Sequence, residues 1–363
     1  MSSSRVHNFG AGPAALPVGV LERVRAELLD YGGTGRSILE LSHRSPQYDE
    51  VHEQARSRLL RLLGAGDEFE VLFMGGGART QFSLVPMNLL GAGQQAGYLV
   101  TGRWSELALA AGERLGGARA VWSGKDEAYS RLPDSGDYEP SSDAAFLHYT
   151  SNNTIYGTQF ADAPESGGVP LVADMSSDIL SRPVDLGRHG LIYAGAQKNL
   201  GPAGVTVVLI RRDLLEAARP DLADMMSYRA VAAKRSLLNT PPVFAIYVMN
   251  LVLEDLEAEG GLEGAAQRSQ AKADLIYGAI ERSGGFYLPH AAPGSRSLMN
   301  VTFRLAEPEL EASFLEEAES QALVGLKGHR SVGGVRASIY NSVATASVEA
   351  LASFLDDFRL ARG

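Results

Sequence analysis

Short apolar runs alternate along this chain with longer stretches in which apolar residues recur every three or four positions. The short runs are typical of buried strands, and the periodic stretches are typical of amphipathic helices. Their alternation predicts βαβ units and a largely parallel sheet. The predicted strands cover residues 70–73, 97–100, 118–122, 145–149, 170–173, 191–194 and 205–210, and the first predicted helix covers residues 17–29.

The pattern changes near Ala258–Gly261, where one long helical stretch breaks and another begins at Leu262. After this break the chain predicts strands over 297–303 and 334–339, and helices over 308–320 and 347–362. Strands that alternate with helices in this way suit a smaller α+β domain. We therefore expect a domain boundary close to the break.

Lys198 and Asp174 each lie at the carboxyl end of a predicted strand. Such ends project into one crevice of an open α/β sheet, which is where these sheets bind ligands. An amine that forms a Schiff base, with a carboxylate to pair a pyridinium nitrogen, is what pyridoxal phosphate (PLP) chemistry requires. The alternative is a surface lysine and an aspartate that caps a helix.

The segment Gly75–Phe82 follows a predicted strand and leads into an apolar periodic helix. A strand, a glycine-rich turn and a helix start together form an anion site, because free N–H groups and the helix dipole point at the ligand. The segment is not a nucleotide motif, and the alternative interpretation is a tight turn between strand and helix. Trp104 follows the next strand, where it either stacks on a planar ring or belongs to the core.

Two His-Arg pairs, His43-Arg44 and His329-Arg330, stand in an otherwise acidic chain with a formal net charge of −10. Each pair offers a charge-assisted fork for phosphate or carboxylate, although either pair alone also fits a solvated turn. The two together suggest an anionic substrate.

Composition narrows the function classes further. The acidic balance argues against nucleic acid binding. With no cysteine among 363 residues, disulfides, thiolate metal sites and cysteine nucleophiles are excluded, and the seven histidines lack metal-site spacing, so no metal is expected. The start of the chain shows no apolar leader and no run long enough to cross a membrane, so we expect a cytoplasmic protein.

Several segments, taken in order, resemble the phosphoserine aminotransferase family, which belongs to the class V aminotransferases of PLP fold type I. The resemblance rests on residues 8–14, 42–44, 75–82, 151–157, 173–177, 193–204, 239–242 and 327–341. It implies a large PLP-binding α/β domain over residues 16–258, with a mostly parallel sheet. It also implies a small α+β domain formed by residues 1–15 and 259–363.

The resemblance implies a homodimer with shared active sites that works in serine biosynthesis. Such an enzyme moves the amino group of glutamate to 3-phosphohydroxypyruvate by a ping-pong mechanism, giving phosphoserine and 2-oxoglutarate. Some bacterial members also act in pyridoxine biosynthesis, and the sequence leaves that question open.

The resemblance also implies roles for individual residues. Lys198 resembles the Schiff-base lysine, Asp174 the partner of the pyridine nitrogen, and Trp104 the residue that stacks on the ring. Thr154 resembles the residue that contacts the phenolic oxygen. The expected contacts of the cofactor phosphate are Ala78, Arg79 and Gln197, with Asn239 and Thr240 of the partner subunit.

For the substrate, the resemblance assigns the α-carboxylate to Arg336. It assigns the substrate phosphate, or the distal carboxylate of glutamate, to His43, Arg44, His329 and Arg330. Ala78 departs from members that have glycine there, but a methyl group leaves the backbone N–H free.

Two alternatives remain at this point. The first is another class V enzyme, such as a small-amino-acid:glyoxylate aminotransferase or a desulfurase, although a desulfurase needs a thiol that this chain lacks. The second is a non-catalytic module that binds phosphoanions. The pair formed by Lys198 and Asp174 argues against the second alternative.

Overall fold

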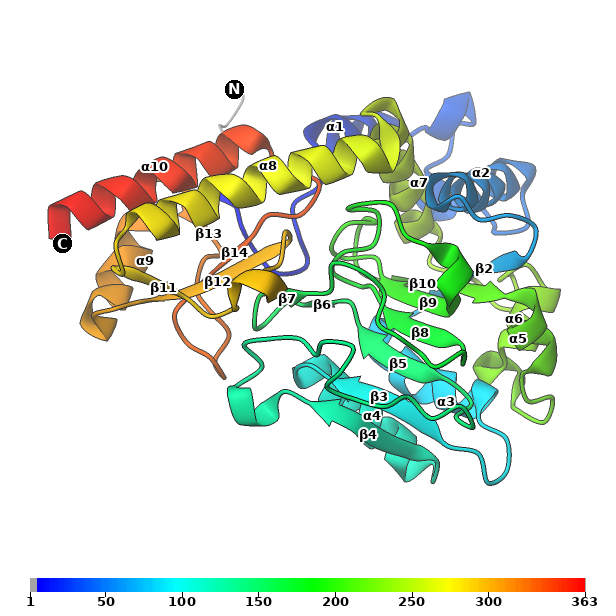
Figure 1. The fold of residues 1–363 in the computed structure, drawn as a ribbon. Coiled ribbons are helices and arrows are strands. Elements are labelled where there is room, and N and C mark those ends of the chain that lie inside the picture. The colour runs from blue at the N-terminus through cyan, green and yellow to red at the C-terminus, as the bar shows by residue number, and fades with distance from the viewer. Residues whose placement is uncertain (1–4, 363) are drawn as a thin grey trace.

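A computed structural model describes residues 5–362, so Met1–Ser4 of the predicted small domain and the final Gly363 lie outside the described residues. Its centre is a seven-stranded sheet with the order β2-β10-β9-β8-β5-β3-β4 (Figure 1). The strands are β2 (Phe69–Gly75), β3 (Ala96–Val100), β4 (Ala118–Ser123), β5 (Leu147–Thr150), β8 (Leu171–Asp174), β9 (His189–Gly195) and β10 (Val205–Arg211).

Alternation along β10 shows how the sheet is covered on both faces. Val207 and Leu209 belong to one core cluster with residues of several helices, and Val208 and Ile210 belong to another cluster on the opposite face. Successive side chains of a strand point to opposite faces, so a strand buried on both faces is apolar throughout. The first cluster includes α2 (Pro46–Leu63) and α7 (Val243–Ala258), and the second includes α3 (Gln81–Leu89) and α4 (Arg103–Arg114).

The direction of β10 is the exception in this sheet. It pairs antiparallel with both β2 and β9, whereas β9, β8, β5, β3 and β4 are parallel. Residues 196–204 connect β9 to β10, which is too short for the crossover that a parallel pair needs. The carboxyl ends of the parallel strands and of β2 therefore meet at one edge of the sheet.

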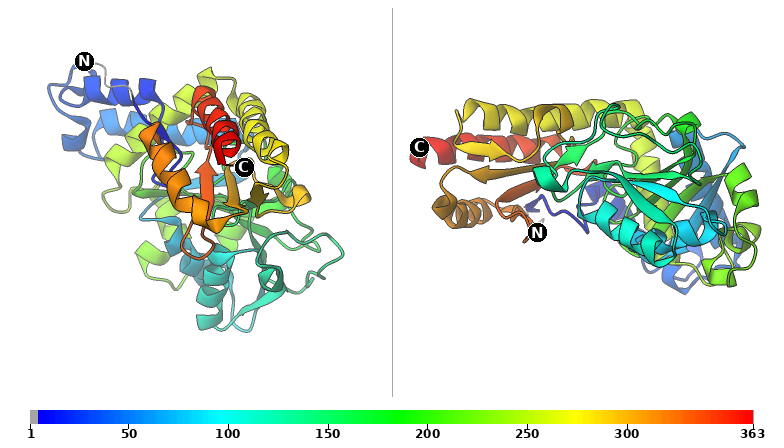
Figure 2. Two further views of the ribbon diagram at one scale, coloured as in Figure 1. Left: turned by 90° about the vertical axis from the view of Figure 1, so that its left-hand side faces the viewer. Right: turned by 60° about the horizontal axis from the view of Figure 1, so that its bottom comes forward.

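A second core forms around the three-stranded sheet β11-β12-β14, made of β11 (Tyr287–Pro289), β12 (Asn300–Leu305) and β14 (Val335–Ser338). Helices α8 (Gly261–Arg282) and α10 (Thr345–Arg362) run side by side over this small sheet, and α9 (Glu311–Ser320) lies at its far end (Figures 1 and 2). The N-terminal strand β1 (His7–Asn8) pairs with β13 (Leu323–Val324), so the start of the chain joins the same region.

The remaining elements are short or peripheral. They are α1 (Val18–Glu27), α5 (Arg212–Ala217), α6 (Tyr228–Ala233), and the paired strands β6 (Asn152–Asn153) and β7 (Thr158–Gln159). Across residues 5–362, no helix has the length and apolar character needed to span a membrane.

The structure confirms the α/β class and the order of the predicted strands and helices. The short strands β1, β11 and β13 were not predicted, and several predicted elements differ at their ends. Asp174 is the last residue of β8 instead of the residue after it, and the predicted helix 308–320 begins as a 3-10 turn at Pro308–Leu310. The predicted strand 297–303 begins three residues later, because Ser297 forms a turn with its hydroxyl bonded to the backbone of Met299 and Asn300.

Candidate active site

A cavity of about 460 Å³ lies at the edge where the parallel strands end. Asp174 at the end of β8, Thr150 at the end of β5 and Lys198 in the loop after β9 all line it. These residues are far apart in the sequence. Strand pairing brings them together, because β5 pairs with β8 and β8 pairs with β9. This is the crevice at the carboxyl ends of the strands that the pattern predicted.

Asp174 is held in one orientation by the residue two positions ahead. Its Oδ1 accepts hydrogen bonds from the backbone N–H of Ser176, at 2.9 Å, and from the Ser176 hydroxyl, at 2.6 Å. Burial raises the pKa of Asp174, while the Ser176 hydrogen bonds and the positive charge of Lys198 oppose that rise. A protonated ring nitrogen placed against Asp174 would favour the carboxylate form still further.

The amine of Lys198 lies across the cavity from Asp174 and donates to Thr154 Oγ1 at 2.9 Å. Gly12, with a φ of 137° that favours glycine, brings the N-terminal segment beside the lysine side chain. The pKa of Lys198 is lowered to about 8, mainly by burial and to a smaller degree by the positive charge of Arg336, while Asp174 opposes the change. A substantial fraction of this lysine is therefore a neutral amine near pH 8.

One end of the cavity is built to bind an anion. Ala78 and Arg79 open the turn that leads into α3, and their N-cap residue Gly77 has no side-chain cap. The first N–H groups of a helix have no intrahelical partner, so those of Ala78 and Arg79 are free for a ligand. Gln197, beside Lys198, lines the same cavity.

The opposite wall comes from the small sheet. Arg336 on β14 and His329 in the preceding loop both line the cavity. Burial lowers the pKa of Arg336 and, together with the neighbouring arginines, lowers the pKa of His329. The guanidinium of Arg336 gives this wall a positive charge that can pair with an anionic ligand.

Three buried polar atoms of the cavity lining have no hydrogen-bond partner within residues 5–362: Trp104 Nε1, Thr150 Oγ1 and Arg336 Nε. Buried polar groups are nearly always paired, so these atoms are suited to ligand contacts. An amine, a buried carboxylate, an indole ring and an anion site in one cavity are the groups that PLP needs. The residues present therefore fit this cofactor.

Most of the predicted site residues come together in this cavity. Its lining includes Ala78, Arg79, Trp104, Thr154, Asp174, Gln197, Lys198, His329 and Arg336. The other predicted residues, which are His43, Arg44, Asn239, Thr240 and Arg330, are not part of the lining formed by one chain. Arg44, Asn239, Thr240 and Arg330 are exposed, and His43 is partly exposed.

The sequence pattern assigned no role to four polar lining residues, Thr150, Asn152, Ser176 and Ser177. For Ser176 a signal was present, because an aspartate commonly accepts a hydrogen bond from the backbone two residues ahead. Thr150 and Asn152 had no comparable signal, since a polar residue at a strand end is common in any sheet.

Comparison with known proteins agrees with this geometry. Residues 6–351 match the family model described as aminotransferase class-V. The phosphoserine aminotransferase of Geobacillus kaustophilus is 54% identical over 355 residues, which cover 98% of each chain.

Solved structures give the same result. The phosphoserine aminotransferase from Bacillus circulans subsp. alkalophilus superposes with a TM-score of 0.97 at 52% identity, covering 99% of this chain and 100% of that chain. The PLP-bound phosphoserine aminotransferase from Trichomonas vaginalis gives a TM-score of 0.92 at 37% identity, covering 97% and 99%. This chain belongs to the class V aminotransferase family, and membership makes it a PLP-dependent transaminase.

Proposed function

We propose that this transaminase is a phosphoserine aminotransferase that moves the amino group of glutamate to 3-phosphohydroxypyruvate in serine biosynthesis. The products are phosphoserine and 2-oxoglutarate. The observation that carries the proposal is the placement of Lys198, Asp174 and Arg336 around one cavity. Relatives of that name at about half identity and nearly full coverage support the choice of substrate.

Asp174, Lys198 and Trp104, which line one cavity, would hold the ring of the cofactor. Its phosphate would accept hydrogen bonds from the N–H groups of Ala78 and Arg79 and from Gln197. When bound, PLP supplies an electron sink that stabilises negative charge on the substrate α-carbon. Asp174 would hold the ring nitrogen protonated, which keeps that sink effective.

Lys198 would move the proton in the reaction. Its amine, with a pKa lowered to about 8, is a competent base near neutral pH once the substrate amine has taken its place on the cofactor. The same amine can return the proton to the neighbouring cofactor carbon. Thr154, which already accepts a hydrogen bond from Lys198, would contact the phenolic oxygen.

Arg336 would bind the α-carboxylate that glutamate and the keto acid share. Its buried Nε has no hydrogen-bond partner among the described residues, so a carboxylate would satisfy a group that is otherwise costly to bury. His329 on the same wall and Arg330 beside it would bind the distal phosphate or carboxylate.

We also propose that the active enzyme is a homodimer in which each site is completed by the other subunit. His43, Arg44, Asn239 and Thr240 lie outside the cavity of their own chain and at least partly exposed, so their proposed ligand contacts require a second copy. The phosphorylated substrate carries charges that do not cross a membrane unaided, so we place this enzyme in the cytoplasm.

The first half-reaction tests the proposal. Glutamate added to the PLP-loaded protein without a keto acid should give about one equivalent of 2-oxoglutarate per site and change the visible absorption of the bound cofactor. Lys198→Ala should lose this turnover, because both the attachment point and the base are gone. Lys125→Ala, a change at an exposed lysine, is the matched control and should keep it. Near-native turnover in Lys198→Ala would refute the assignment.

A further inference from the structure

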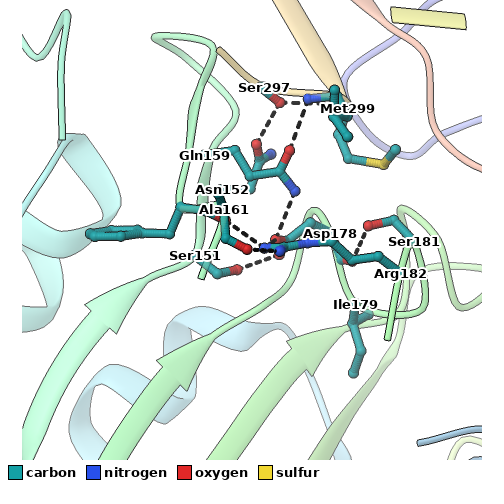
Figure 3. A network of polar contacts seen from close by, with 12 residues as sticks. Ser151, Asn152, Gln159, Ala161, Asp178, Ile179, Ser181, Arg182, Ser297 and Met299 are labelled. Atoms are coloured by element: carbon teal, nitrogen blue, oxygen red, sulfur yellow. Dashed lines mark hydrogen bonds and ion pairs between the residues drawn. The ribbon is translucent and has the colours of Figure 1, made fainter. Parts of the chain in front are cut away.

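A buried chain of polar side chains connects the large sheet to the small sheet beside the cavity (Figure 3). Gln159 Nε2 donates to Asp178 Oδ2 at 3.0 Å, and the backbone N–H of Leu298 donates to Gln159 Oε1 at 2.8 Å. Gln159 and Asp178 are 5% and 4% exposed, so water does not compete for these bonds. Gln159 does not line the cavity itself.

The orientation of the Gln159 amide is fixed by its two partners. The Asp178 oxygen that faces it accepts a hydrogen bond, and the backbone N–H of Leu298 can only donate. The amide nitrogen must therefore face Asp178 and the amide oxygen must face Leu298. A flipped amide would lose both bonds and leave buried groups unpaired.

Asp178 is itself anchored from several sides. The Ser151 hydroxyl donates to its Oδ1, and the Arg182 guanidinium lies 3.7 Å from its Oδ2. Burial raises the pKa of Asp178, and Arg182 opposes that rise most strongly. The other titratable groups that act on it are Lys198, Asp174 and Tyr149.

A second set of bonds runs parallel to the first. The Ser297 hydroxyl donates to Asn152 Oδ1 at 2.6 Å, and Asn152 Nδ2 donates to Asn300 Oδ1 at 2.7 Å. These contacts end at residues 297–300, the entry to β12, as the Gln159 contact does. The start of β12 is thus tied to the loops of the large sheet at two neighbouring points.

The position of β12 in turn determines the position of β14, the strand that carries Arg336. β12 pairs with β14, and Thr302 of β12 stands opposite Arg336 of β14. Lys198 belongs to the side of the cavity formed by the large sheet, and Arg336 belongs to the side formed by the small sheet. The hydrogen bond between Gln159 and Leu298 therefore connects these two sides. We propose that Gln159 is a positioning residue, which sets where Arg336 stands relative to Lys198 by joining Asp178 to the backbone of Leu298. This inference rests on the proposed function of Arg336 in carboxylate binding.

The first test measures the hydrogen bond between Leu298 and Gln159 in cofactor-free protein, independently of catalysis. Gln159→Met keeps the length of the side chain but removes both hydrogen bonds. We expect the amide of Leu298 to exchange its hydrogen at least about tenfold faster than in wild type, because its partner is gone. Gln321→Glu, a change at an exposed glutamine on the far side of the small sheet, is the control and should leave Leu298 unchanged.

Gln159→Glu adds a pH dependence that only this geometry produces. The introduced carboxyl would face Asp178 in a buried place, and both burial and the like charge raise its pKa. When protonated, its O–H can donate to Asp178 and its other oxygen can accept from Leu298, so the tie is rebuilt. Once the proton leaves, the introduced carboxylate cannot donate to Asp178 and is repelled by it, which should pull it away from Leu298. Relative to wild type at the same pH, Leu298 should therefore be protected near pH 5 and less protected near pH 9.

The second test uses the loaded enzyme. Gln159→Met should raise KM for glutamate and for the keto acid together, by about tenfold, while the visible spectrum of the bound cofactor keeps its pH titration. A merely structural role would lower the active fraction, and therefore kcat, without changing KM.

Unchanged exchange at Leu298, or faster exchange with an unchanged KM, would overturn the positioning role. A wild-type protein that transfers no amino group would instead refute the proposed function, and the exchange measurement would still decide whether the tie exists. If Gln159→Met does not fold, Gln159→Glu supplies the folded variant for both measurements, with the Leu298 contact intact near pH 5 and weakened near pH 9.

Discussion

At the scale of single residues, the site depends on how burial and charge act together on Lys198. Removal from water disfavours its ammonium form, and Arg336 adds repulsion, whereas Asp174 stabilises the charge. The net result is a pKa of about 8 in place of the ordinary value of 10.5. The sequence predicted this lysine from its strand-end position, but the acidity of its ammonium depends on neighbours brought in from distant segments.

This acidity can be measured by chemical labelling. In cofactor-free folded protein, reductive methylation of Lys198 should rise with pH through a midpoint near 8, because only the neutral amine reacts. In denatured protein the same lysine should follow an ordinary midpoint of about 10.4. Mass spectrometry of the peptide that contains Lys198 gives both profiles, and coincident profiles would contradict the argument.

At the scale of elements, the loop between β14 and α10 is held by one buried lysine of α8. Lys272 is 1% exposed, and its Nζ donates to the carbonyl oxygens of Tyr340, at 2.6 Å, and Val343, at 3.1 Å. The same loop supplies Asn341, whose N–H donates to Asn199 Oδ1 next to Lys198. An amine at a buried helix position thus holds together a segment behind the cavity.

Replacing this lysine should therefore cost stability. Lys272→Met keeps the apolar stem but removes the hydrogen bonds to the carbonyls of Tyr340 and Val343, of which only Tyr340 keeps another backbone donor. This loss should lower the free energy of unfolding by roughly 1–3 kcal/mol. Urea unfolding at a fixed protein concentration measures the loss. Lys125→Met, at an exposed position, should change little. Equal unfolding curves for Lys272→Met and wild type would show that the carbonyls find other partners.

The strands also show which features of the fold a local sequence pattern can predict. Because β8, β9 and β10 are buried on both faces of the sheet, their sequences are continuous apolar runs. The existence and the order of these strands could therefore be predicted. The direction of β10 follows from the short connection over residues 196–204, a signal that the prediction of a largely parallel sheet did not use. Contacts such as Gln159 with Leu298 join segments more than a hundred residues apart, and no local pattern contains them.

At the scale of the whole molecule, we propose a division into residues 16–258 and residues 1–15 with 259–363. Two separate cores support it, since Phe9 of the N-terminal segment packs with the small-sheet core. Leu262 and Ala265 at the start of α8 belong to the core of the large sheet, so this helix spans the junction. The cavity lies between the two units, and its proposed completion by a second chain is a property of the assembly.

Mixed dimers test the shared sites. Lys198→Ala should be inactive, and so should a variant with Asn239 and Thr240 both changed to alanine. If each site takes Asn239 and Thr240 from the partner subunit, a mixed two-fold dimer collects both lesions in one site and leaves the other intact. Random mixing makes about half the dimers mixed, so activity should return to about a quarter of wild type. Confirmed mixed dimers without recovered activity would show that these residues serve their own chain.

The central claim is amino transfer between glutamate and a phosphorylated keto acid, and its most direct test is the substrate preference of the wild-type enzyme. Specificity constants for 3-phosphohydroxypyruvate and for hydroxypyruvate should be compared at one pH and ionic strength, with glutamate as donor. Charge-assisted hydrogen bonds contribute about 1.5–3 kcal/mol each, so two such bonds to the phosphate predict a preference of at least about 100-fold. Formation of phosphoserine with that preference is the expected result. Equal constants for the two keto acids, or no phosphoserine at all, would contradict the account.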